Sequence, residues 1–343
     1  MKFSTNYILY PDNKSLEKAL AHYKSLISEE EAKGLSPDSR VAVADNFIHT
    51  RGNYEQHRYS ANVLESARAT LEALVTDKLR DESPLDWSEL HNSLGNILAG
   101  LGQNLRDAGL YNLSIASFNE VLGVLSQEEN PLEWAATKSN LATALQALGR
   151  QEADAKLLSN AIDEYTEALF VYSRKETPEE WSVVMFQLAA TYHSYGHLLK
   201  GNRTFQKSVV AYKNALAELD ADLYALELTA THNNRGSVLQ HLAESEENAE
   251  RLEEAIRAYE TALTVAMEQQ LPFHLAVLIR TNKSTARAVL AELTKDAALA
   301  EEVADEFEVI IECFPHAIQP LCLKHCEAQL EKAQAQLEEF SGS

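Results

Sequence analysis

The feature that most constrains this chain is a repeat of 47 residues. The three tryptophans stand at this spacing: Trp87, Trp134 and Trp181. A large ring recurs with the same period: Phe118, Tyr165, Tyr212 and Tyr259. Prolines also recur: Pro37, Pro84, Pro131 and Pro178. A repeat of this length predicts an array in which each unit buries its apolar face against its neighbours.

Each unit opens with a signature of a helix start. The pairs Ser83-Pro84, Asn130-Pro131 and Thr177-Pro178 are each followed two residues later by a carboxylate. We expect the first residue of each pair to cap a free backbone N–H with its side chain. Proline is favourable at the first helical position because an N–H there has no intrahelical partner. The signature therefore predicts that a helix begins at each of these prolines.

Small residues occupy one position in each of these helices: Gly95, Ala142, Ala189 and Gly236. The recurring rings fall in a second helix, where most follow a small residue by one turn, as in Ala161 and Tyr165. A small residue in the first helix lets the paired helix approach closely. Each unit is thus predicted to be a helical hairpin that stacks on the next.

These motifs resemble the tetratricopeptide repeat, through the L-A/G-x-x-L core, the Ala-x-x-x-Tyr pattern and the initial proline. The resemblance covers roughly residues 37 to 335. It implies an all-α, right-handed superhelical solenoid of helical hairpins with about 14 helices. The chain departs from the family, whose repeat is about 34 residues long. We therefore expect an extended variant with longer helices.

Three regions follow from this interpretation. Residues 1–35 form an N-terminal segment and capping helix, and residues 315–343 form a C-terminal capping helix and tail. Residues 36–314 form six hairpins, with these bounds: 37–78, 84–126, 131–173, 178–219, 222–268 and 272–314.

The charge of the chain narrows the classes of partner. The formal net charge is −22, which disfavours nucleic acids and anionic membrane surfaces. No signal peptide and no apolar run long enough to span a membrane is present. The three cysteines fit a reducing compartment. We expect a cytoplasmic protein.

Catalytic motifs are absent from the sequence. It contains no glycine-rich phosphate loop, no G-x-S-x-G and no H-E-x-x-H. We therefore predict a protein that is not an enzyme and that uses no cofactor.

Amide side chains recur nine residues after several of the prolines. By resemblance to tetratricopeptide arrays, amides at these positions line a groove that binds a peptide or helix of a partner protein. The predicted groove residues are Asn46, Asn92, Asn96, Asn140, Gln187, Asn233, Asn234, Arg280 and Asn282. The alternative is that these amides bond neighbouring helices within the solenoid. A basic partner fits the charge but is not required by it, and the oligomeric state stays open.

Two groups of histidine and cysteine residues have partial metal-ligand spacing. His193 and His197 lie one helical turn apart, but no third ligand is evident in the sequence, so no metal is predicted there. The other group lies near the C-terminus: Cys313, His316, Cys322, His325 and Cys326. These five residues either bind a metal or belong to the core. A regulatory or sensor subunit that uses them for metal or redox sensing is therefore the alternative to an interaction scaffold.

Overall fold

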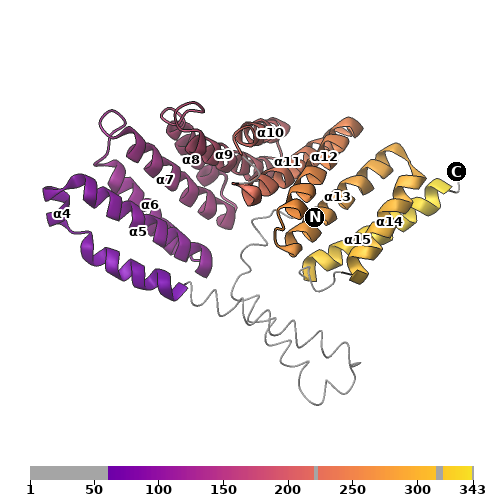
Figure 1. The fold of residues 1–343 in the computed structure, drawn as a ribbon, viewed down its shortest axis with the longest axis horizontal. Helices are drawn as coiled ribbons and strands as arrows, with labels where there is room; N and C mark the ends of the chain where they lie inside the picture. The colour runs from indigo at the N-terminus through magenta and orange to yellow at the C-terminus, as the bar shows by residue number, and fades with distance from the viewer. Residues whose placement is uncertain (1–60, 220–222, 314–319, 342–343) are drawn as a thin grey trace, which may run out of the picture. The chain divides into compact units, whose positions relative to one another are not determined.

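A computed structural model describes residues 61–219, 223–313 and 320–341, and every regular element within these ranges is an α-helix (Figure 1). The chain divides into two compact units, whose described parts are residues 61–171 and 172–341. The predicted all-α class is thus confirmed. No helix in the described ranges is long and apolar enough to cross a membrane.

The N-terminal unit contains two complete hairpins. Residues 61–74 are helical and lead into a short helix that was not predicted, α4 (Asp77–Glu82). The hairpins follow as α5 (Pro84–Leu105), α6 (Ala108–Leu122), α7 (Pro131–Glu152) and α8 (Ala155–Ala168). Each helix from α4 to α8 packs against the next, and α5 also contacts α7. The two hairpins therefore stack within this unit.

The C-terminal unit contains three hairpins and a final helix. Its helices are α9 (Pro178–Leu199), α10 (Asn202–Leu216), α11 (Ala225–Glu246), α12 (Ala249–Glu268), α13 (Phe273–Thr294), α14 (Ala297–Cys313) and α15 (Pro320–Ser341). Consecutive helices pack together here too, and α15 covers α13 as well as α14. The first helix of each hairpin contacts the first helix of the next one, α9 with α11 and α11 with α13, as α5 does with α7.

Proline begins three of the first helices, as predicted. Pro84, Pro131 and Pro178 stand at the start of α5, α7 and α9. Pro272 instead precedes α13 as its N-cap. The step from the start of α11 to the start of α13 is therefore 48 residues, one more than the repeat of 47.

The residues predicted to cap these helices do not form the predicted hydrogen bonds. Ser83, Asn130 and Thr177 precede the helices, but their side chains cap no backbone N–H. The Ser83 hydroxyl donates to the Asp86 carboxylate at 2.6 Å instead. Thr177 donates to the carbonyl of Ser173 and accepts from its N–H. Proline removes one N–H of the first turn, and the side chains of Ser83 and Thr177 take other partners.

The side-chain caps lie at the second helices. Asp154 Oδ1 accepts from the backbone N–H groups of Lys156 and Leu157, and Asp107 and Asn248 cap α6 and α12 in the same way. The preceding residue in each turn adopts left-handed backbone, with φ of 48 to 54°: Arg106, Ala153, Lys200, Glu247 and Lys295. These five residues end the first helices, so the tight turn is a repeating device that the sequence interpretation missed.

The predicted close contact between paired helices is confirmed. A Cβ on Gly95 would lie 2.5 Å from Phe118 Cε1, and one on Gly236 would lie 2.8 Å from Tyr259 Cε1. The rings at this repeat position are almost completely buried: Phe118, Tyr165, Tyr212, Tyr259 and Phe307. Ring and small residue together set the distance between the two helices of a hairpin.

Several predictions concern residues outside the described ranges. They are the N-terminal capping helix within residues 1–35, the first helix of the 37–78 hairpin, and Asn46.

Candidate functional site

The predicted amides of the N-terminal unit bond to one another across two first helices. Asn140 Nδ2 on α7 donates to Asn92 Oδ1 on α5 at 3.1 Å. Asn92 Nδ2 in turn donates to Thr137 Oγ1 on α7 at 3.3 Å. Asn92 and Asn140 are half-buried, and Asn96 is exposed. These amides join α5 to α7 and still reach the surface.

The same relationship recurs in the C-terminal unit. Asn282 Nδ2 on α13 donates to Asn233 Oδ1 on α11 at 2.9 Å, and Asn233 Nδ2 donates to Asn234 Oδ1 at 3.4 Å. All three side chains are buried, with 0 to 3% of their surface exposed. Their burial supports the alternative that the amides bond neighbouring helices within the solenoid. It leaves little of their surface for a peptide.

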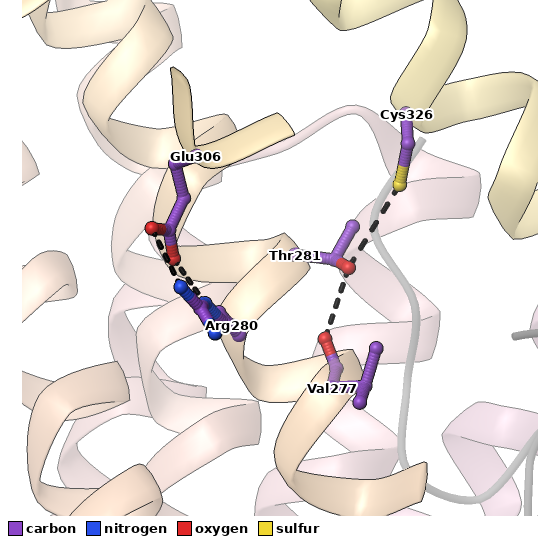
Figure 2. A network of polar contacts seen from close by, with 5 residues as sticks. All are labelled: Val277, Arg280, Thr281, Glu306 and Cys326. Carbon is purple, nitrogen blue, oxygen red and sulfur yellow. Dashed lines mark hydrogen bonds and ion pairs between the residues drawn. The ribbon is translucent and has the colours of Figure 1, made fainter. Parts of the chain in front are cut away.

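The two remaining predicted groove residues lie on α9 and α13. Gln187 is half-buried on α9. Arg280 forms a two-pronged ion pair with Glu306 of α14, in which Nη2 lies 2.9 Å from Oε2 (Figure 2). The hydrogen bond and charge of Arg280 hold the pKa of Glu306 below its usual value. Arg280 thus ties the two helices of its hairpin together.

One exposed surface of the N-terminal unit combines amide and apolar side chains. Positions 2, 6, 9 and 13 of a helix fall within about 60° of one another around its axis. In α5 and α7 these positions hold Leu85, Glu89, Asn92, Asn96, Leu132, Ala136, Ser139 and Thr143, which we call the α5–α7 face. Leu85 is 54% and Leu132 53% exposed. Only Glu89 carries a charge, so the face is mainly apolar and amide in character.

The equivalent positions of the C-terminal unit differ. On α11, Ala230, Asn233 and Ser237 are buried. On α9, Glu179 replaces the exposed leucine at the second position. The α5–α7 face is therefore the more accessible of the two surfaces.

The C-terminal cysteines belong to the core where the structure describes them. Cys322 and Cys326 are 3% and 0% exposed. Cys326 Sγ lies 3.9 Å from the hydroxyl of Thr281, which donates to the carbonyl of Val277 (Figure 2). Burial raises the pKa of the Cys326 thiol. Such a thiol is poorly suited to redox sensing, which needs an accessible thiolate.

The histidine of this group also has a local partner. His325 Nε2 lies 3.1 Å from Thr285 Oγ1. Cys322, His325 and Cys326 do not gather as metal ligands among the described residues. The side chain of Cys313, and His316, lie outside the described set.

A third histidine joins the pair on α9. His193, His197 and His241 bring one ring nitrogen each to within 4.8 Å of one another. His193 and His197 are on α9, whereas His241 lies on α11, 44 residues further along the chain. The sequence interpretation found no third ligand because α11 brings it there only through packing.

A small pocket of about 250 Å³ lies against Trp87 and His91 in the N-terminal unit. Arg80 lies 4.8 Å from the centre of the Trp87 ring, and Glu72 and Glu120 complete the rim. Burial lowers the pKa of His91. Ligand pockets usually enclose about 300 to 1,000 Å³, so this one lies below that range and we assign it no function.

Comparisons with known proteins find solved structures with a similar fold, but they find no matching family. No family model and no curated protein matches the chain. Among solved structures, the chain is similar to BtubC (BKLC) from P. vanneervenii, with 17% identity, a TM-score of 0.48, and coverage of 73% of this chain and 92% of that one. It is also similar to a Rap protein complexed with Competence and Sporulation Factor, with 13% identity, a TM-score of 0.26, and coverage of 96% and 99%. Identity and TM-score are low in both cases, so the proposals for this chain rest on its own residues.

Proposed function

We propose that this chain is a non-enzymatic interaction scaffold, an extended variant of the tetratricopeptide repeat, that holds a segment of a partner protein against the α5–α7 face. The observation that supports the proposal is that two adjacent first helices each carry an exposed leucine, beside the amides of α5. Leu85 and Leu132 stand at the same position of their helices and are more than half exposed.

The chemistry of the face defines the partner segment. Exposed leucines favour apolar side chains, because covering each removes apolar surface from water. The exposed amide of Asn96 offers both a donor and an acceptor at no cost in charge, which suits the backbone of an extended segment or the polar edge of a helix. A single carboxylate, Glu89, gives little selection for a basic partner. The partner segment is therefore apolar and mainly uncharged.

The hydrogen bonds between α5 and α7 prepare this face for binding. Asn140 and Thr137 fix α7 against Asn92 of α5. Since the two helices are already held together, a partner segment orders little of the scaffold when it binds. Preorganisation of this kind raises affinity by lowering the entropy lost on association.

The proposal is tested by affinity capture of the tagged full chain from its native cell, with mass spectrometry. The test variant carries Leu85→Asp and Leu132→Asp. The control carries Leu113→Asp on α6, where a leucine is 50% exposed but lies outside the face. We expect the main partner to be captured at least about tenfold less by the test variant, because a carboxylate would be buried without a partner.

The control should capture the partner as the unchanged protein does. Far-UV circular dichroism and thermal melting should agree among the three proteins. Equal capture by all three, or no specific partner for the unchanged chain, contradicts the proposal.

A further inference from the structure

We propose that His193, His197 and His241 form a binding site for a borderline divalent transition metal, for which Zn²⁺ is the probe. Imidazole nitrogen is a preferred ligand of this class of ion. The site lies in the C-terminal unit and is independent of the α5–α7 face.

The distance between the two ring nitrogens on α9 fits a tetrahedral ion. Zinc binds imidazole nitrogen at about 2.0 to 2.1 Å, which places two nitrogens of a tetrahedral site about 3.3 Å apart. His193 Nε2 and His197 Nε2 lie 3.2 Å apart. The nitrogen of His241 lies within 4.8 Å of both, so the third ligand needs to approach by at most about 1.5 Å.

The surroundings of the three rings restrict their orientation. Phe205 of α10 stacks on His241 at 5.6 Å between ring centroids. The same ring meets His197 edge-on at 5.2 Å and His193 at 6.0 Å. The three rings therefore stand between the buried ring of Phe205 and solvent at the exposed His197.

The repeat itself does not require histidines here. The sixteenth residue of α9 is His193, whereas α7 and α11 have Gln146 and Gln240 there. Both of those amides accept from the tyrosine hydroxyl of their second helix. The twentieth residue is His197 in α9 and never histidine in the other first helices from α5 to α13. The other first helices thus form with other residues at these two positions.

A bound ion would link two first helices and keep a free coordination position. Two ligands come from α9 and one from α11, so coordination crosslinks adjacent repeats. Three protein ligands leave a fourth position for water or for an outside group, the arrangement of an open zinc site.

The experiment is calorimetric titration of Zn²⁺ into the full chain, which is stripped with a chelator and carries no histidine tag. Test variants are His197→Gln and His241→Gln. The control is His274→Gln, at the second position of α13, whereas the three histidines stand between the sixteenth and twentieth positions of α9 and α11. We expect one equivalent of Zn²⁺ in the unchanged and control proteins. Each test variant should lose at least about tenfold in affinity, as expected when one of three ligands is removed.

Thermal melting supplies a second readout. Zn²⁺ should raise the melting temperature of the unchanged and control proteins, because an ion that binds only the folded chain stabilises it. His197→Gln replaces an exposed residue, so its fold should persist, and Zn²⁺ should no longer raise its melting temperature. Zinc binding that survives both test substitutions lies elsewhere on the chain and overturns the proposal. Less than one tenth of an equivalent in the unchanged protein does the same.

Discussion

The side-chain amide of Asn282 donates a hydrogen bond of 2.9 Å to Asn233 Oδ1, and Asn140 donates to Asn92 in the same way at 3.1 Å. In both pairs the donor stands at the tenth position of a first helix and the acceptor at the ninth position of the preceding one. These four amides, which the sequence predicted to bind a peptide, therefore join successive repeats within each unit.

We predict that Asn282→Ala destabilises the C-terminal unit by about 1 to 3 kcal/mol, because it leaves the buried Asn233 Oδ1 without this donor. Asn140→Ala should cost less, since Asn92 and Asn140 are half-buried and water can replace the lost partner. Urea denaturation of both variants measures the difference. A double-mutant cycle of Asn233→Ala with Asn282→Ala should give a coupling of at least about 0.5 kcal/mol. Additive effects of the two substitutions would contradict the assignment.

A second prediction concerns the left-handed turn between paired helices. Ala153 has φ of 53°, a conformation that costs a residue with a Cβ about 1 to 2 kcal/mol. Glycine avoids this cost but loses more entropy on folding. We expect Ala153→Gly to stabilise the N-terminal unit by about 0.5 to 1 kcal/mol. Ala147→Gly, within α7, should instead destabilise it by about 1 kcal/mol. Chemical denaturation of both variants tests whether the two substitutions change the free energy of unfolding in opposite directions.

A third prediction compares two glycines of α5. A Cβ on Gly95 would overlap Phe118, whereas one on Gly100 would meet only Leu64 Cδ1, at 3.5 Å. We expect Gly95→Ala to destabilise the fold by about 1 to 3 kcal/mol through overpacking. Gly100→Ala should be neutral or stabilise by up to about 1 kcal/mol, because alanine is the better helix former. Similar melting temperatures for the two variants would show that the ring moves aside without cost.

A fourth prediction concerns pH. Burial, with a smaller effect from Arg235, lowers the pKa of His232 to about 4, below the usual 6.5. Between these two values the unfolded chain binds a proton at His232 and the folded chain does not. The contribution of His232 to the free energy of unfolding is therefore fully present above about pH 6.5. It decreases as the pH falls toward 4, by up to about 1.4 kcal/mol per pH unit.

Denaturation of the unchanged protein and of His232→Gln at pH 7, 6 and 5 checks this slope. The variant should lose less stability on acidification, since it removes the group that takes up the proton. Parallel curves for the two proteins would assign the acid sensitivity to other groups.

The sequence by itself determined the helices and their pairing. Proline at the first helical position, a small residue at Gly95 and a ring at Phe118 act through contacts within one hairpin, so their spacing was enough to predict it. The caps were harder to predict, because a serine before a proline can bond Asp86 as readily as a backbone N–H. Local chemistry did not distinguish these two outcomes.

Only the tertiary structure decided what the polar residues do. The partner of Asn282 lies 49 residues away in the preceding repeat, and the third histidine lies 44 residues from His197. Burial decides whether an amide is a surface ligand or an internal link, and burial depends on how successive first helices pack. A repeat places the same positions on every helix, but whether a residue at such a position faces solvent or a neighbour is settled by packing between repeats.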